Sequence, residues 1–173
     1  VNVDSGVDYR LRTLEQAELY HHPLDSEANS SLEKSFQGLI ADPRHVEANS
    51  SVEILGRKIP AKAVCDDIAW FDFYALCDGP RSQNDYIELG KLFHAVIVSD
   101  VPAMGSKNDD LARRFINLID EFYDRGVKVI MSADAPIPDI YSTGKLEFEF
   151  QRTTSRMLEM QSHEYLAREH RPD

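Results

Sequence analysis

The chain has 173 residues, enough for one large domain or two small ones and enough to bury a core without disulfides or metals. Hydrophobic residues make up 42% and charged residues 28% of it, a composition typical of folded globular proteins that excludes wholesale disorder. The formal net charge of −11 disfavours non-specific binding to nucleic acid, which takes its affinity from Lys and Arg at phosphates. No apolar run approaches the ~20 residues that cross a bilayer, so the sequence predicts neither a nucleic-acid partner nor a membrane span.

The first forty residues predict short extended pieces followed by one helix. The chain opens on Val1–Asp4 with no Met and no leader, and these residues with Ser5-Gly6 predict a short strand and a turn, as though the chain were cut from a longer one. Asp8–Arg12 and Leu19–His22 are two further extended candidates. Apolar residues then recur at helical spacing, which predicts a helix over about 25–40.

The middle of the chain predicts antiparallel strands behind a linker. The polar stretch Pro43–Ser51, rich in Ser and Asn, is typical of a linker. Three strand-like runs follow and predict an antiparallel meander: Val52–Leu55, Lys58–Cys65 and Ile68–Cys77. The two cysteines, Cys65 and Cys77, have no metal-ligand spacing, so we expect buried free thiols in a reducing compartment and no metal site.

The second half of the chain alternates helix and strand. A helix is predicted over Asn84–Phe93 and a buried strand over His94–Asp100. An amphipathic helix over Asp109–Arg125 leads to a second buried strand, Val127–Ala133. Strand, helix and strand in this order predict a right-handed crossover between adjacent parallel strands. A last helix is predicted from about Phe150 through Met157 and Leu158 and as far as Tyr165, before a frayed tail at 168–173.

These elements predict an α/β fold made of a parallel βαβ unit, an antiparallel β meander and flanking helices. The corresponding segments are 1–42, a strand and helix that continue from a preceding domain; 43–51, the linker; 52–78, the meander; and 79–173, the α/β unit with its C-terminal helix. No internal repeat and no low-complexity tract interrupts this order.

The sequence contains no phosphate-binding loop. A Walker A loop needs a Gly-rich stretch that ends in Gly-Lys-Ser or Gly-Lys-Thr, because backbone amides, the lysine and a hydroxyl-bound magnesium meet the phosphates there. The two Gly-Lys pairs, Gly90-Lys91 and Gly144-Lys145, are each followed by Leu. A GxGxxG loop is also absent, so the chain has no recognisable nucleotide-binding motif of its own.

Two polar residues close buried strands. Asp100 ends an apolar run in the manner of a Walker B acid that faces magnesium, and Ser132 ends a run in the manner of a polar residue that senses a phosphate. Both are candidate cofactor-binding residues. Many parallel strands end in a polar residue at the carboxyl edge of a sheet, so a purely structural role is the favoured interpretation of each.

Arginines form the other candidate group: Arg81, Arg113, Arg114, Arg152 and Arg156. A guanidinium at a subunit boundary can stabilise the charge on a transferring phosphoryl group through its rigid fork of donors. Ordinary ion pairing is the alternative, because 30 acidic residues face 19 Lys and Arg. Asp110 lies four residues before Arg114 and is a possible partner at helical spacing.

The order of several motifs resembles the ZapE/AFG-like family of P-loop ATPases, relatives of the AAA+ proteins. The resemblance rests on these stretches: Asp8–Arg10, Arg81–Tyr86, Leu92–His94 through Ser99–Pro102, Ala112–Ile116, Leu118–Tyr123, Ser155-Arg156 and Glu159–Ser162. It extends over nearly the whole chain and is weakest over 26–61. It implies a P-loop-NTPase-like fold, and it places the Walker A loop, the true Walker B acids and the first sensor in an ATPase core upstream of the chain shown.

The resemblance implies a parent protein that hydrolyses ATP with Mg²⁺ and forms a homo-oligomer. The chain alone is expected to bind neither ATP nor Mg²⁺. It makes Arg114, Arg81 and Arg156 candidates for an arginine finger or a sensor, with Arg114 first. Bacterial members imply a cytoplasmic protein that acts with FtsZ and the division machinery. Mitochondrial members imply a matrix protein that acts on inner-membrane proteins or with proteases.

Two other classes of function stay open. In one, the chain is a non-catalytic partner-binding module whose contact surface is the meander. In the other, which ranks last, it is a small-molecule enzyme that uses Asp100 and Ser132, although no nucleophile and base are recognisable.

Overall fold

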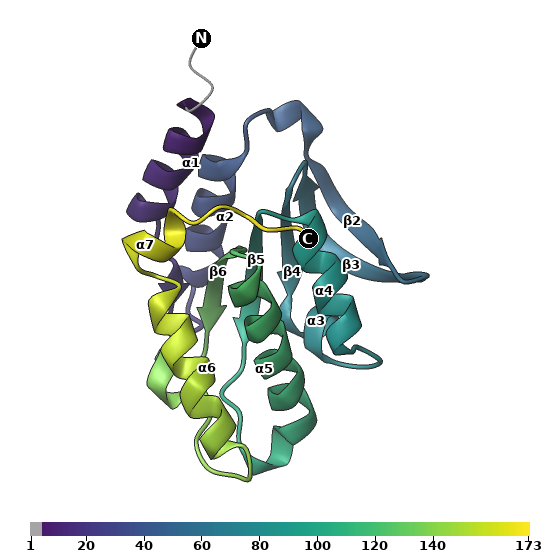
Figure 1. Cartoon of the computed structure of the whole chain (residues 1–173), viewed down its shortest axis with the longest axis vertical. Helices are drawn as coiled ribbons and strands as arrows, with labels where there is room; N and C mark the ends of the chain where they lie inside the picture. Colours follow the sequence, from purple (N-terminus) through teal and green to yellow (C-terminus); the bar gives the residue numbers. More distant parts are fainter. Residues whose placement is uncertain (1–4) are drawn as a thin grey trace.

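The computed structural model describes residues 5–173 (Figure 1), so the predicted strand Val1–Asp4 lies outside the described residues. Within this part of the chain six strands form one sheet in the order β1-β6-β5-β4-β3-β2. The strands are β1 (Tyr20–His21), β2 (Glu47–Ile54), β3 (Arg57–Cys65), β4 (Ile68–Asp72), β5 (Ala95–Val101) and β6 (Lys128–Ala133). The helices are α1 (Ser5–Gln16), α2 (Ala28–Leu39), α3 (Phe73–Cys77), α4 (Gln83–Leu92), α5 (Asp109–Asp124), α6 (Glu147–Glu159) and α7 (His163–Leu166).

Strand pairing confirms the α/β class. β5 and β6 are parallel neighbours joined by α5, and β2, β3 and β4 form the predicted antiparallel meander. The meander and the βαβ unit are also joined to each other, because β4 pairs in parallel with β5. The sheet therefore continues across residue 78, where the sequence suggested a boundary. β1 extends the parallel part by pairing with β6.

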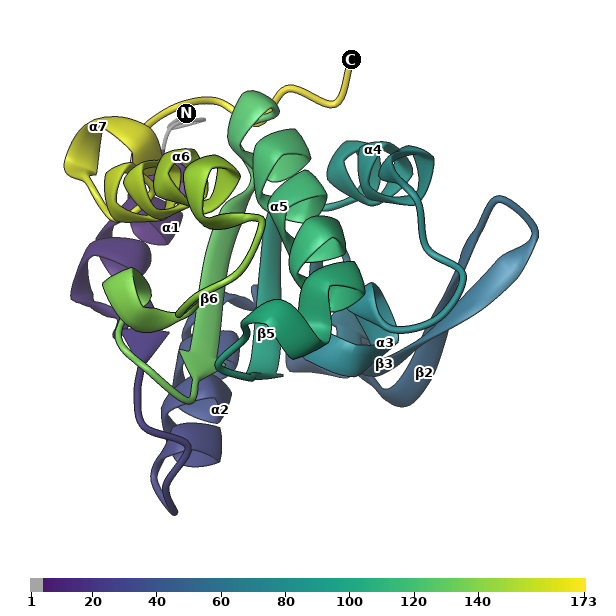
Figure 2. The same cartoon turned by 90° about the horizontal axis from the view of Figure 1, so that it is seen from below.

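The sheet lies between two layers of helices (Figure 2). Helices α4, α5 and α6 cover one face, and α2 lies on the other face, where α1 contacts it. Successive side chains of β5 accordingly belong to opposite faces of the sheet. Val96 and Val98 belong to the core under α5, whereas Ala95 and Ile97 belong to the core under α2. A strand buried on both faces has no polar side, which explains the continuous apolar runs of β5 and β6.

The first segment is helical where extended structure was expected. The predicted turn at Ser5-Gly6 and the predicted extended piece Asp8–Arg12 are wrong, since both lie in α1. The helix is stabilised by tertiary contacts: Leu14 is buried in the core beneath α2, and Arg10 forms an ion pair with Asp67 in the turn between β3 and β4. The extended prediction at Leu19–His22 is confirmed by β1.

The predicted linker over Pro43–Ser51 is also wrong. A short 3-10 helix spans Pro43–His45, and β2 begins at Glu47 and pairs with β3 along its length. β2 lies at one edge of the sheet and is mostly exposed, so its polar residues are those of a solvated strand. Composition alone does not distinguish such a strand from a linker.

The run Ile68–Cys77 is divided between two elements. β4 ends at Asp72, whose carboxylate accepts a hydrogen bond from the backbone N–H of Tyr74 at 3.0 Å and caps helix α3. The prediction of strand beyond Asp72 is therefore wrong, because this cap begins a helix. The thiols of Cys65 and Cys77 are free and buried, as expected.

The C-terminal region is longer and better anchored than predicted. α6 begins at Glu147, three residues before Phe150, and Tyr165 lies in a separate short helix, α7. The predicted frayed tail is wrong: the backbone N–H of Arg171 donates to the carbonyl of Arg125 at 2.7 Å, and the Arg125 side chain donates to the carbonyl of Pro172 at 2.8 Å. None of the helices within residues 5–173 combines the length and apolarity needed to cross a bilayer.

We predict that Phe115→Ala lowers the free energy of unfolding by about 3–5 kcal/mol, because the side chain is fully buried in α5 and its removal leaves a cavity. The Phe115 ring packs against the rings of Phe73 and Phe150 at centroid distances of 5.9 and 6.1 Å. Chemical denaturation measures the loss, with the exposed Arg113→Ala in the same helix as the control. A loss below about 1 kcal/mol would contradict the packing of α5 on the sheet.

Candidate functional site

The parallel strands β1, β6, β5 and β4 end at a common carboxyl edge of the sheet, where ligands of open α/β folds usually bind. Both predicted cofactor-binding residues, Asp100 and Ser132, lie at this edge. The backbone N–H of Asp100 donates to Ser132 Oγ at 2.9 Å, so the structure brings the two residues into direct contact. Ser132 is buried, and its hydroxyl links the ends of β5 and β6.

The backbone of Asp100 is in an uncommon conformation. Its φ is +64°, in the left-handed region that a non-glycine residue adopts at a cost, and the β5–β6 register shifts between Val98 and Val101. The irregularity leaves the Asp100 side chain half exposed, with its carboxylate 4.0 Å from Lys62 Nζ on β3. The sheet edge thus presents a carboxylate next to an ammonium group.

Asp72 is a third polar residue at this edge, and it was not predicted from the sequence. It ends β4 beside the end of β5, and its pKa is raised by burial and by the neighbouring Asp100 carboxyl. The missed signal was available, because the run Ile68–Asp72 is an apolar strand closed by an acid, like the run that ends at Asp100. Lys62 carried no such signal, since β3 runs antiparallel to β4 and only the sheet brings it here.

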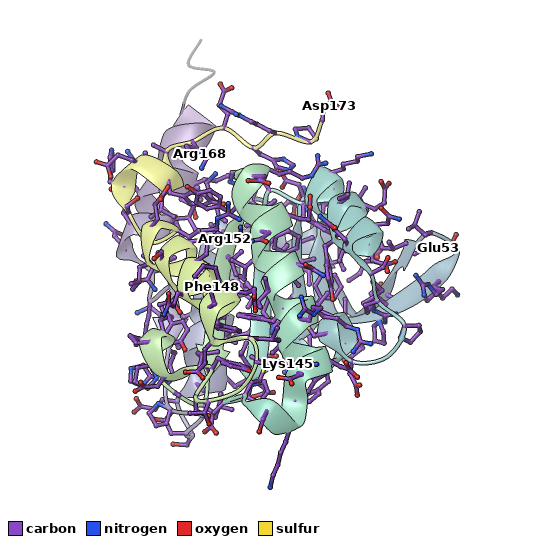
Figure 3. The ribbon with its side chains drawn as sticks, turned by 60° about the horizontal axis from the view of Figure 1, so that its bottom comes forward. Glu53, Lys145, Phe148, Arg152, Arg168 and Asp173 are labelled. Atoms are coloured by element: carbon purple, nitrogen blue, oxygen red, sulfur yellow. The ribbon has the colours of Figure 1, made fainter. Side chains whose placement is uncertain are left out.

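We predict that Asp72→Asn becomes more stable relative to the wild type as pH rises, because the wild type loses stability over this range. A carboxyl whose folded pKa is raised binds its proton more tightly in the folded state, so the wild type loses stability as pH rises from about 4 through the raised pKa. Asn keeps the helix cap and removes the titrating group. Denaturation of both chains between pH 4 and pH 8 measures the difference, and Glu53→Gln at the exposed hairpin (Figure 3) is the control. A difference that stays constant with pH would contradict the prediction.

Two predicted arginines meet at the C-terminal end of α3. Arg81 Nε donates to the carbonyl of Ala75 at 3.0 Å, and Arg114 Nη1 donates to the carbonyl of Cys77 at 3.3 Å. The Tyr86 hydroxyl donates to the carbonyl between them, that of Leu76, at 2.8 Å. The last carbonyls of a helix lack partners within the helix and carry partial negative charge, so cationic donors stabilise them.

The charge of this arginine pair is not neutralised by an acid. Within the described part of the chain neither Arg81 nor Arg114 has a carboxylate at ion-pair distance, including Asp110, the partner considered from spacing. Burial raises the pKa of the adjacent Cys77 thiol to about 12, against the effect of both guanidinium groups. Both side chains are half-buried, whereas neighbouring Arg113 is exposed. The two guanidinium groups are therefore held in position by backbone carbonyls, and their charge is not paired with a carboxylate of the described residues.

Arg156 is placed differently. Its Nη1 lies 2.5 Å from Asp120 Oδ1, and its guanidinium stacks over the ring of Tyr123 at 4.9 Å. Arg152, labelled on α6 in Figure 3, contacts the other oxygen of Asp120 at 3.2 Å. These contacts join α5 to α6, so a structural role accounts for Arg156 without a nucleotide.

A complete Mg–ATP site does not fit the residues present. The sequence has no Gly-Lys-Ser or Gly-Lys-Thr loop. Over residues 5–173 no group of three or more His, Cys, Asp and Glu side chains is placed to hold a metal ion. The carboxyl edge and the arginine pair could contribute single groups to a nucleotide held elsewhere.

The profile of the AFG1-like ATPase family matches residues 1–169 of the chain. The chain is similar to the cell division protein ZapE of Escherichia coli strain K12, with 47% identity over 170 residues that cover 98% of this chain and 45% of that protein. It is 30% identical to the lactation elevated protein 1 homolog B of Danio rerio over 198 residues, covering 95% of this chain and 39% of that protein.

An uncharacterized protein of Schizosaccharomyces pombe is 37% identical over 146 residues, which cover 84% of this chain and 32% of that protein. The chain thus spans less than half of the length of these relatives. No solved structure matches the chain significantly. Because the family profile and the 47% identity both extend over nearly the whole chain, the chain belongs to the AFG1-like ATPase family.

Proposed function

We propose that this chain is the C-terminal region of an ATP-hydrolysing protein, and that it brings Arg81 and Arg114 to the phosphates of a nucleotide held by an upstream core. The observation that carries the proposal is the pair of half-buried guanidinium groups without carboxylate partners at the end of α3. A charge developing on a transferring phosphoryl group is well stabilised by such a fork of donors that is already in position.

The position of the pair supports this role over the alternatives. α3 begins at Phe73, directly after its cap Asp72, so the arginines are anchored to the element that starts at the carboxyl edge of the sheet. An arginine finger that is held by backbone carbonyls stays in place, and its charge is not neutralised by a carboxylate. Arg156 is a weaker candidate, because its charge is matched by Asp120.

The wider biological role rests on the similarity to a bacterial cell division protein. We propose a homo-oligomeric, cytoplasmic parent that uses ATP and Mg²⁺ and acts on the division machinery, for which FtsZ remains the predicted partner. A mitochondrial matrix protein that acts on inner-membrane proteins or with proteases is the alternative. Each is tested by locating the full-length protein and its co-purifying partners in cells.

We predict that Arg114→Ala in the full-length protein reduces ATP turnover by about 10³-fold, the effect of losing an arginine finger. Arg81→Ala is expected to reduce turnover in the same direction. Steady-state ATP hydrolysis measures both, with thermal unfolding to verify that the fold survives. If the two variants keep near-normal turnover, the pair only caps α3 and the proposal fails.

Two variants serve as matched controls. Arg113→Ala removes an exposed arginine from the adjacent position of α5 and should leave turnover and stability unchanged. Arg156→Ala breaks the link between α5 and α6, so it should lower stability and leave the turnover of the folded protein largely intact. A large loss of turnover in folded Arg156→Ala would instead make that residue the finger or sensor.

We predict that the 173-residue chain alone gives no specific heat when Mg-ATP is titrated into it. Phosphates are held mainly by the backbone amides of a glycine-rich loop, and this sequence has no such loop. Binding at micromolar concentration would contradict the prediction and favour the small-molecule enzyme that uses Asp100 and Ser132.

A second candidate function is a partner-binding module without a role in hydrolysis. The observation that favours it is β2, an exposed strand that, within residues 5–173, pairs with β3 alone and projects from the body of the molecule (Figure 1). Leu55 at the turn of this hairpin is 57% exposed. An edge strand can add a strand from a partner. This function becomes the better account if the arginine variants keep their turnover.

A further inference from the structure

A charged cluster around His21 joins α1, β1 and α2 and lies apart from the arginine pair. His21 is the last residue of β1, and its side chain is only 10% exposed. Its Nδ1 lies 2.8 Å from Oε1 of Glu18, which precedes β1, and its Nε2 lies 3.0 Å from Oδ1 of Asp25, which follows β1. Each ring nitrogen of this buried imidazole therefore faces a carboxylate oxygen.

The two contacts together determine the charge of the imidazole. An ionised carboxylate only accepts hydrogen bonds, and a neutral imidazole has one N–H and one nitrogen lone pair. Both contacts are hydrogen bonds only when both ring nitrogens carry a proton, which is the imidazolium state. In a neutral ring one lone pair would lie against a carboxylate oxygen and would be repelled by it.

Both carboxylates are themselves anchored to the start of α2. Oε1 of Glu18 accepts a hydrogen bond from Oγ of Ser31 at 2.6 Å. Oδ1 of Asp25 accepts one from the backbone N–H of Glu27, the residue before α2, at 3.0 Å. The imidazolium of His21 therefore ties β1 to α2 through two charge-assisted contacts, which are stronger than hydrogen bonds between neutral groups.

β1 has few other contacts that hold it on the sheet. Its two residues pair with Met131 and Ser132 of β6, and the backbone N–H of Met131 donates to the carbonyl of Leu19 at 2.9 Å. The hydroxyl of Tyr20 donates to the carbonyl of Ala135. A strand with so short a ladder opens locally at low cost, so the charged contacts contribute a large share of its stability. Because β1 pairs with the end of β6, the cluster borders the carboxyl edge of the sheet.

The ring has no other charged neighbour within the part of the chain that the structure describes. The two residues of β6 that face β1 are uncharged. Glu27 and Lys34 line the same hollow of about 860 Å³ between α1 and α2, which lie side by side in Figure 1, and neither is at ion-pair distance from the ring of His21. His21 also lines this hollow, so protons reach the ring from solvent.

The electrostatic balance agrees with the geometry. Hydrogen bonds to Glu18 and to Asp25 raise the pKa of His21, against the opposing effect of burial. Hydrogen bonds from Ser31 and His21 lower the pKa of Glu18, and the one from His21 lowers that of Asp25. All three groups are therefore charged over a wider pH range than they would be in the unfolded chain.

We propose that His21 is a pH-sensitive latch, whose second ring proton holds β1 and the connection between α1 and α2 on the carboxyl edge of the sheet. The latch is closed while the imidazolium faces two carboxylates, and it opens when the ring loses a proton. Because the folded pKa is raised, the stabilisation is complete below the ordinary value of about 6.5 and is lost as pH rises through the folded value. Opening frees the end of β6 next to Ser132. The latch does not depend on the role proposed for the arginine pair.

The first test follows the ring ¹⁵N signals of the chain labelled at histidine between about pH 5 and pH 10. At pH 7 both ring nitrogens of His21 should be protonated, and their titration should lie above about 6.5. Glu18→Gln and Asp25→Asn should each lower this titration, because each removes one negative charge next to the ring. Glu27→Gln is the matched control: it removes a carboxylate from the same hollow that does not contact the ring, so the titration should not change.

The second test measures amide hydrogen exchange of Met131, whose partner is the carbonyl of Leu19 on the latched segment. The amide of Val98 in β5, a strand that pairs on both sides, is the reference, and the ratio of the two protection factors cancels the ordinary acceleration of exchange with pH. Between about pH 6 and pH 9 the protection of Met131 relative to Val98 should fall about tenfold for each unit by which the titration of His21 exceeds ~6.5. His21→Gln should show the low protection at every pH, because an amide carries no charge.

Three results would overturn the proposal. If His21 titrates at or below about 6.5, the folded chain does not hold the imidazolium. If the protection ratio stays constant while His21 titrates, the cluster is a fixed structural contact and no latch. If the titration of His21 is the same in folded Glu18→Gln and Asp25→Asn as in the unaltered chain, the two carboxylates do not hold the proton. The first two results come from the unaltered chain and do not depend on how the variants fold.

Discussion

Strand β5 pairs in parallel with β4 on one side and with β6 on the other, and both of its faces are buried. Parallel pairing has a direct consequence for chemistry, because all carboxyl ends lie at one edge and all amino ends at the other. The carboxyl edge gathers Asp72, Asp100 and Ser132, while the amino edge gathers His94 and Lys128. The helices return the chain across the sheet between strands, as parallel pairing requires.

Helix α3 connects this sheet to the proposed catalytic role. It has only five residues, so its C-terminal carbonyls cannot be satisfied within the helix. Arg81, Tyr86 and Arg114 come from outside it and satisfy three successive carbonyls. The same contacts that complete the helix hold two guanidinium groups in place. A structural role and the proposed catalytic role are therefore compatible in these arginines, and the effect of their removal on ATP turnover distinguishes the two.

Much of the second half of the fold could be predicted from the sequence. The apolar stripe of α5 and the apolar runs of β5 and β6 specify a strand, helix and strand, since their periodicity differs and each must bury its apolar side. The errors lie where local signals are weak. α1 is held by Leu14 and by the Arg10–Asp67 pair, which are contacts with distant residues, and the polar strand β2 resembles a linker in composition.

For the candidate sites, the sequence by itself determined the family motifs, the absence of a phosphate loop, Asp100 and Ser132 as polar residues that close buried strands, and Arg81 and Arg114 as candidate arginines. These follow from residue type and position along the chain. Only the tertiary structure decided that Asp100 contacts Ser132, that Arg81 and Arg114 converge on α3, and that Arg156 is paired with Asp120. Each of these contacts joins residues that are separated along the chain, by 6 residues for Arg81 and Ala75 and by 37 for Arg114 and Cys77. The pairing order of the strands and the packing of helices bring them together, and neither is encoded in local spacing.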